Sequence, residues 1–114
     1  MKDFVLLFRQ PGIDASRFTP QEMETYIKRW DDWIGGIAAQ GRLNGSRKRL
    51  TQEGKVLKAG GVITDGPFVE IKERLGGLII VKAESLEEAT TLAHGCPALD
   101  LNGSVEIRPV MDEH

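Results

Sequence analysis

The densest group of residues able to do chemistry lies in segment 64–76, which reads TDGPFVEIKERLG. Asp65 opens a glycine-proline turn, and an aspartate in that place usually accepts a hydrogen bond from the backbone N–H two residues on. Pro67 has no N–H to donate. Asp65 is therefore expected either to cap another N–H of the turn or to line a pocket, where it is the candidate catalytic base.

Glu70 and Lys72 follow this turn and share one face if the segment is extended. Two interpretations stay open for them. Either they belong to a solvated strand, where surface ion pairs are common and contribute little, or they bind substrate. In the second case Lys72 holds a carboxylate of the ligand and Glu70 is a further acid–base group.

Glu106 and Arg108 have the same spacing in the alternating segment 104–110. A strand there places both on its polar face, opposite Val105 and Ile107. If that face is covered, the charges must pair or bind something, because unpaired burial is costly. They are expected to pair within the chain or between subunits, or Arg108 binds an anionic ligand. Arg9, at the end of the first strand, is a candidate ligand-binding residue of the same kind.

Two further groups of residues could be interpreted as functional, but a structural role is favoured for both. His94 and Cys96 supply only two potential metal ligands, and a histidine at a helix end has a simple electrostatic role. Trp30 and Trp33 are expected in the core or at an interface. No phosphate-binding glycine loop is present in the sequence. We therefore expect neither a metal nor a cofactor.

The composition describes one domain over residues 1–114, with 40% apolar residues and one cysteine. The net charge of −2 argues against nucleic acid as a partner. No apolar run approaches the ~20 residues that span a bilayer, and the first residues lack a signal-peptide pattern. We expect a cytoplasmic protein without a membrane partner. The basic stretch 42–58 predicts either a solvated hairpin or an anion-binding face.

Apolar patterns predict the elements. Continuous runs at 4–8 and 75–81 are typical of strands covered on both faces. A helix is predicted from the N-cap Thr19, with a capping box to Glu22, as far as Gly41. Its inward stripe would contain Met23, Tyr26, Ile27, Trp30, Ile34, Ile37 and Ala38. Gly35 and Gly36 inside it should cost about 2 kcal/mol, offset by close packing against another backbone or by a local break.

The remaining segments complete the predicted topology. Weaker patterns at 43–50 and 54–63 predict a hairpin, and a capping box at Ser85–Glu88 starts a second helix ending at 95–97. Its inward residues would be Leu86, Ala89, Leu92 and Ala93. The order is that of an α+β, ferredoxin-like βαββαβ fold with an extra hairpin element, its two helices on one face of an antiparallel sheet. A second copy would cover the other face, giving a homodimer through the sheet faces.

These motifs together resemble the YCII-related family, specifically its DGPF branch. The matching residues are 64–68, Glu70, Lys72, Glu73, 75–77, 95–97 and 103–110. The resemblance covers nearly the whole chain and implies a dimeric α+β barrel. It also implies a catalytic His–Asp pair whose aspartate would be Asp65. This sequence has only His94 and His114, neither near the first strand, so a histidine-dependent mechanism is not implied here.

The function expected from these observations is a small-molecule-binding homodimer. It would act as a cofactor-free acid–base enzyme of isomerase or lyase type on a small anionic metabolite, with Asp65 as base. The alternative is a non-catalytic binding or regulatory module. Some relatives are encoded beside or fused to extracytoplasmic-function sigma factors, so the resemblance implies a sigma factor as a candidate partner. Whether the chain is an enzyme stays open at this stage.

Overall fold

The computed structural model describes residues 1–10, 15–51, 53–65 and 74–112. Its main elements in chain order are β1 (Lys2–Arg9), α1 (Pro20–Ala39), β2 (Leu43–Arg49), β3 (Lys55–Leu57), β4 (Ile63–Asp65), β5 (Leu75–Ala83), α2 (Leu86–Ala93) and β6 (Ser104–Pro109). Short 3-10 helices lie at Ala15–Arg17 and Pro97–Leu101. The fold is α+β, as predicted.

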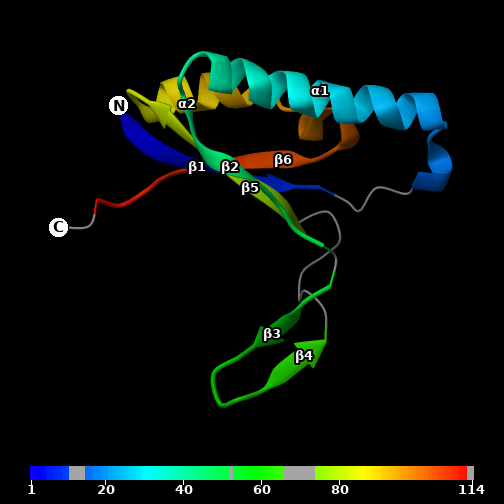
Figure 1. Ribbon diagram of the computed structural model, residues 1–114. Helices are drawn as coiled ribbons and strands as arrows, with labels where there is room; N and C mark the ends of the chain where they lie inside the picture. The colour runs from blue at the N-terminus through cyan, green and yellow to red at the C-terminus, as the bar shows by residue number, and fades with distance from the viewer. Residues whose placement is uncertain (11–14, 52, 66–73, 113–114) are drawn as a thin grey trace.

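A four-stranded antiparallel sheet with the order β2-β5-β1-β6 forms the centre of the molecule. Both α-helices lie on the same face of this sheet (Figure 1). That arrangement is compatible with a ferredoxin-like fold. Among the described residues, no helix is both long enough and apolar enough to cross a bilayer.

The core lies between the helices and the sheet. Leu6, Phe8, Ile79 and Val81 are fully buried there. Phe8 meets Trp30 edge to face, with the ring centroids 4.9 Å apart, a geometry that aromatic pairs favour. The placement of Trp30 in the core is therefore confirmed.

The predicted caps of α1 are confirmed. The side chain of Thr19 accepts from the Glu22 N–H and the Glu22 carboxylate accepts from the Thr19 N–H. The helix ends at Ala39, and Gly41 follows with φ of 70°, as a glycine after a helix commonly does. The explanation for Gly35 and Gly36 was wrong, because the helix is unbroken and a Cβ added at either position would meet no atom within 4 Å.

The inward stripes were predicted only in part. Tyr26, Trp30 and Ile37 are buried on α1, whereas Ile27 and Ala38 are exposed. On α2, Ala89 and Ala93 are buried and Leu86 is exposed. The predicted stripes were therefore wider than the faces that the helices bury.

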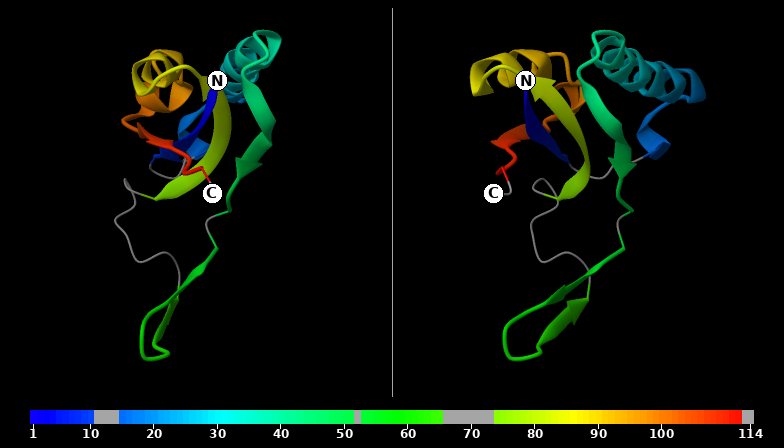
Figure 2. Two further views of the ribbon diagram at one scale, coloured as in Figure 1. Left: turned by 90° about the vertical axis from the view of Figure 1, so that its left-hand side faces the viewer. Right: turned by 60° about the vertical axis from the view of Figure 1, so that its left-hand side comes forward.

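The predicted hairpin between 43–50 and 54–63 was wrong. β2 pairs instead with β5, as an edge strand of the main sheet. The hairpin is formed by β3 and β4, with Lys55 opposite Asp65, and it turns through Gly60 and Gly61, both at positive φ. This β3–β4 hairpin stands away from the sheet on the side opposite the helices (Figures 1 and 2).

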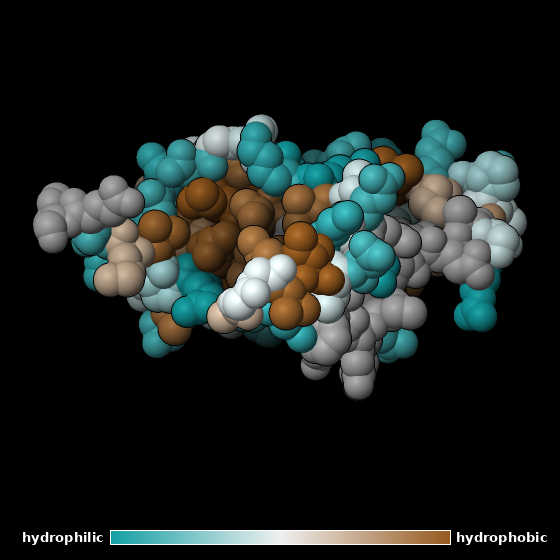
Figure 3. All heavy atoms as spheres, turned by 90° about the horizontal axis from the view of Figure 1, so that it is seen from below, coloured by the Kyte–Doolittle hydropathy of each residue, from teal (hydrophilic) through white to brown (hydrophobic). Residues whose placement is uncertain are grey.

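The sheet face away from the helices, here called the open face, is largely apolar. Burial alternates along β1 and β5, so that Val5, Leu7, Leu78 and Ile80 point away from the helices and are partly exposed. Figure 3 shows apolar side chains gathered on this side of the molecule. Within the described residues, the predicted covering of both faces is thus achieved on the helix side only.

Candidate functional site

Three of the predicted charged residues lie together on the open face. Strand pairing places Leu7 opposite Glu106 and Val5 opposite Arg108, while Val105 and Ile107 pack against the core. This confirms the predicted two faces of the last strand. Arg9 donates from Nε to Oε1 of Glu106 at 3.3 Å, and Arg108 lies 3.8 Å from Oε2. Glu106 therefore interacts with both guanidinium groups and offsets one of their two positive charges.

Asp65 ends β4 on the β3–β4 hairpin, and its side chain is 95% exposed. Its nearest described charge is the Lys55 ammonium, 3.7 Å away across the hairpin. The remainder of the turn, including Pro67, Glu70 and Lys72, lies outside the described residues. In the described part of the chain, no residue encloses the Asp65 carboxylate as an acid–base catalyst would require.

A different part of the molecule contains a cleft with the properties of a binding site. It has a volume of about 290 Å³ and lies between α1, the end of β2 and the start of β5. Its polar lining includes Gln10, Asp31, Arg47, Arg49 and Arg74, and its apolar lining includes Met23, Ile27, Trp30, Leu50 and Leu75. We refer to it as the arginine cleft. Its size is at the lower limit of ligand pockets, which suits a small metabolite.

Local irregularities in β2 and β5 build one wall of this cleft. Between Asn44 and Lys48, β2 advances four residues while β5 advances two, from Ile80 to Leu78. Such a bulge bends a strand and re-aims its side chains, and Gly45 within it has φ of 82°. At Gly77 a Cβ would lie 2.5 Å from the Lys48 carbonyl oxygen. The glycine therefore allows the two strands to approach closely beside the cleft.

Arg47 is the central cation of the arginine cleft. Its guanidinium carbon lies 4.2 Å from the centroid of the Trp30 ring, a cation–π contact. Its Nε is buried, and no described residue accepts a hydrogen bond from it. Burial, followed by the neighbouring Arg49 charge, lowers the pKa of Arg47. An arginine nevertheless stays protonated at neutral pH, so a desolvated positive charge faces this cleft.

Arg74 supplies a second buried donor from the start of β5. Its Nε is likewise buried without an acceptor among the described residues. Its carbonyl oxygen accepts from the Gln10 N–H at 3.3 Å, which ties this position to the end of β1. A buried donor without an acceptor is costly. An anion in the cleft would relieve that cost at both guanidinium groups.

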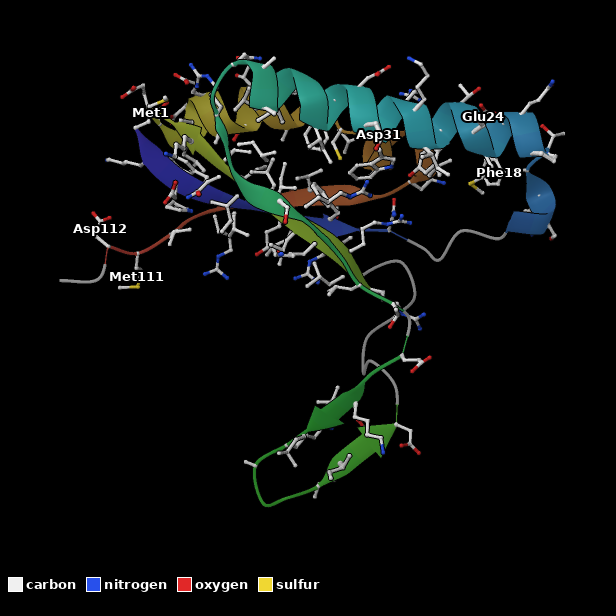
Figure 4. The ribbon with its side chains drawn as sticks, viewed as in Figure 1. Met1, Phe18, Glu24, Asp31, Met111 and Asp112 are labelled. Atoms are coloured by element: carbon white, nitrogen blue, oxygen red, sulfur yellow. The ribbon has the colours of Figure 1, made fainter. Side chains whose placement is uncertain are left out.

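The described lining carries an excess of positive charge. Arg47, Arg49 and Arg74 stand against Asp31 alone. Asp31 projects from the middle of α1 (Figure 4), where its carboxylate acts on Arg47. The described lining therefore has a net positive charge, which favours an anionic ligand.

Tyr26 adds a neutral polar group to the cleft. Its hydroxyl donates to Oε1 of Gln10 at 3.3 Å, and burial raises the pKa of the phenol. The hydroxyl therefore stays protonated around neutral pH. Tyr26 and Gln10 offer hydrogen bonds without adding charge.

No metal centre is evident in the described part of the chain, where no three His, Cys, Asp or Glu side chains are grouped to hold an ion. Cys96 is buried beneath α1, and burial raises the pKa of its thiol to about 11. His94 forms the C-cap of α2. Both residues thus lie in structural surroundings.

The arginine cleft was not predicted as such from the sequence. The basic stretch 42–58 gave the only signal, with an anion-binding face as one of its two interpretations. Arg47 lies within it, but Trp30 was assigned to the core or an interface and Arg74 was not singled out. Other basic residues of that stretch have partners elsewhere, since Arg42 pairs with Glu88 and Lys55 pairs with Asp65. Arg9, Asp65 and Arg108 do not line the cleft.

The antiparallel sheet with both helices on one face places this small domain in the α+β class. A small cationic cleft lies at the edge of the sheet. The model of the YCII-related domain matches residues 38–114, so the chain belongs to the YCII-related family. Arg47 and Arg74 lie inside the matched region, whereas Tyr26 and Trp30 precede it. No curated protein matches the chain.

Proposed function

We propose that this protein binds a small anionic metabolite in the arginine cleft. The observation that carries the proposal is the pair of buried Nε atoms, of Arg47 and Arg74, that lack an acceptor among the described residues. Buried polar groups in native proteins are almost always hydrogen-bonded. A bound anion would satisfy both donors and offset the desolvation of Arg47.

Binding of small anions to Arg47→Met and Arg74→Met tests this proposal. Each substitution removes a charge-assisted hydrogen bond, so affinity should fall roughly 10- to 100-fold. Lys28→Met is the matched control, because it removes the same charge from an exposed pair with Asp32 on α1. Isothermal titration calorimetry with a panel of carboxylates and phosphate gives the readout. Equal affinities for wild type and both arginine variants would refute the proposal.

We propose further that the chain is a homodimer joined through its open face, within the DGPF branch of its family. The partly exposed apolar side chains of β1 and β5 support this, and the β3–β4 hairpin lies on the same side (Figure 1). An isolated two-stranded hairpin is marginally stable, and Leu57 and Ile63 on it are 70% and 59% exposed. A second copy would cover both regions.

Leu7→Lys tests the dimer by placing a charge in the middle of the open face. Sedimentation should give twice the mass of one chain for the wild type and the mass of one chain for the variant. Glu24→Lys is a suitable control, because this exposed residue lies on α1, on the other side of the sheet (Figure 1). A wild type that sediments as a single chain contradicts the proposal.

Acid–base catalysis is the enzymatic extension of this proposal, with Asp65 as base and a cationic side chain steadying negative charge. Within one chain Asp65 is exposed and does not line the cleft, so this step requires a second copy to enclose it. Asp65→Asn should then abolish turnover while leaving binding and dimer mass unchanged. The regulatory alternative, including a sigma-factor partner, predicts no accessible small-molecule site, and the arginine cleft favours the binding proposal.

A further inference from the structure

We infer that the ligand of the arginine cleft is a carboxylate carrying a short apolar or aromatic body. This inference rests on the proposed anion-binding function and adds the chemical class of the anion. It follows from three features of the cleft: a guanidinium group over an aromatic ring, an apolar wall beside it, and a place on α1 beyond the free N–H groups of its N-terminus.

The Arg47 side chain favours an anion with at least two oxygens. Its guanidinium carbon lies 4.2 Å from the Trp30 ring centroid, and Trp30 itself is fixed by edge contacts with Phe8 and Trp33. The guanidinium group is a planar fork of N–H donors. That fork matches the two oxygens of a carboxylate.

The rest of the cleft disfavours a phosphate. Phosphate sites commonly use helix N-termini or clustered backbone N–H groups. On α1 the cleft is lined by residues from Met23 to Asp31, and the Met23 N–H is already bonded to the Thr19 carbonyl oxygen. The described lining therefore offers guanidinium side chains and no free N–H of a helix N-terminus, which suits a carboxylate.

The apolar wall accounts for the body of the ligand. Met23, Ile27, Leu50 and Leu75 line the cleft beside the arginines, and Ile27 and Leu50 are each 48% exposed. An apolar group placed on them would remove their exposed surface from water, which is favourable. Acetate is too small to cover this wall or to fill the volume of about 290 Å³. The cleft therefore suits a carboxylate extended by a ring or a short chain.

The experiment compares phenylacetate, acetate and inorganic phosphate by calorimetry on the full chain. Phenylacetate should bind at least about tenfold more tightly than acetate, since the ring is buried on the apolar wall. It should also bind more tightly than phosphate. Tryptophan fluorescence in a Trp33→Phe background locates binding beside Trp30.

Two variants separate the contributions. Arg47→Lys keeps the charge but loses the planar fork, so phenylacetate should bind about tenfold more weakly. Ile27→Ser should weaken phenylacetate and leave acetate unchanged. Circular dichroism shows that each variant is folded.

Phosphate binding as tightly as phenylacetate, with both weakened in Arg47→Met, would overturn the carboxylate inference and leave the anion-binding function standing. Equal binding of phenylacetate and acetate would overturn the apolar body. Failure of every anion to bind, with no difference between wild type and Arg47→Met, would overturn the proposed function itself.

Discussion

Arg9 and Glu106 are joined across neighbouring strands of the open face, with Nε of Arg9 donating to Oε1 of Glu106 at 3.3 Å. Arg108 approaches the other carboxylate oxygen at 3.8 Å. The same carboxylate thus serves two cations on a surface otherwise bordered by Val5 and Leu7. The pairing explains how charged residues are tolerated on a face suited to covering by a second copy.

Glu106→Gln should lower the free energy of unfolding by about 1 kcal/mol or less, because the pair is partly exposed and screened by solvent. The loss should diminish in high salt. Urea unfolding at low and high ionic strength measures both effects. Asp65→Asn is the control, since it removes the partner of Lys55 on the exposed hairpin and should leave stability unchanged. Equal losses for the two variants would contradict the role given to Glu106.

Much of the fold was predictable because its signals are local. The capping box of α1 and the apolar runs of β1 and β5 each lie within a few residues, and the structure confirms them. The pairing of β2 was not predictable in this way. β2 joins β5, which follows much later in the chain, and the polar pattern of β2 does not specify that partner. The apolar β5 lies in the centre of the sheet, and β2 pairs with the edge of β5 that β1 does not occupy.

The arginine cleft was hidden for the same reason. Trp30, Arg47 and Arg74 are far apart in the sequence and meet only after β2 has joined the sheet. A tryptophan in a helical stripe predicts core packing, and Trp30 does belong to the core. Its second role, as the surface on which Arg47 lies, depends on the bulge in β2 and cannot be derived from helical spacing.

Gly35→Ala and Gly36→Ala should each raise the stability of the protein by about 1 kcal/mol. Both glycines lie inside α1, where alanine has the higher helix propensity. A Cβ at either position meets no atom within 4 Å, so the substitution introduces no clash. Thermal unfolding followed by circular dichroism should show a higher Tm for each variant, and the two gains should approximately add.

Gly77→Ala provides the opposite case. A Cβ there would lie 2.5 Å from the Lys48 carbonyl oxygen, so β2 and β5 must separate and the protein should be destabilised. Stabilisation by all three substitutions would show that strand proximity is not what requires glycine at position 77. Destabilisation by the two helical substitutions would indicate that α1 has a partner at Gly35 and Gly36 in the assembled protein.

The contact between Trp33 and Gly95 should show strong coupling in a double-mutant cycle. A Cβ on residue 95 would lie 2.9 Å from Cδ1 of Trp33 and 3.1 Å from its Nε1. The indole cannot easily withdraw, because Nε1 donates to the Leu92 carbonyl oxygen at 3.0 Å. Gly95→Ala should therefore destabilise the protein by about 1–3 kcal/mol, the usual range for overpacking.

Trp33→Phe removes the indole atoms that the added methyl group of Gly95→Ala would meet. The double variant should be more stable than the sum of the single losses predicts, with a coupling of about 1 kcal/mol. Denaturant unfolding of the four proteins measures this coupling. Additive losses would mean that the Gly95→Ala effect arises from the backbone of the α2 terminus, with no contribution from the indole.

The Cys96 thiol should make stability fall at alkaline pH. Burial raises its pKa in the folded protein from 9.0 to about 11, so the folded state holds the thiol proton more tightly than the unfolded state does. The contribution is fully present below pH 9, declines as the pH rises, and is lost above pH 11. By linkage, a difference of about two pKa units corresponds to at most about 2–3 kcal/mol.

Urea unfolding between about pH 7 and pH 11 should show a smaller alkaline loss for Cys96→Ala than for the wild type. Comparing the two proteins removes the part of the Tyr26 contribution that comes from burial, which is the largest cause of its raised pKa. Because thiolates are the reactive form, the folded wild type should react slowly with a disulfide reagent at about pH 8 and rapidly in denaturant. The prediction fails if the free energy of unfolding falls equally with pH in the two proteins, or if the folded chain is labelled fast. Either result would show that the thiol is ionised and accessible in the native state.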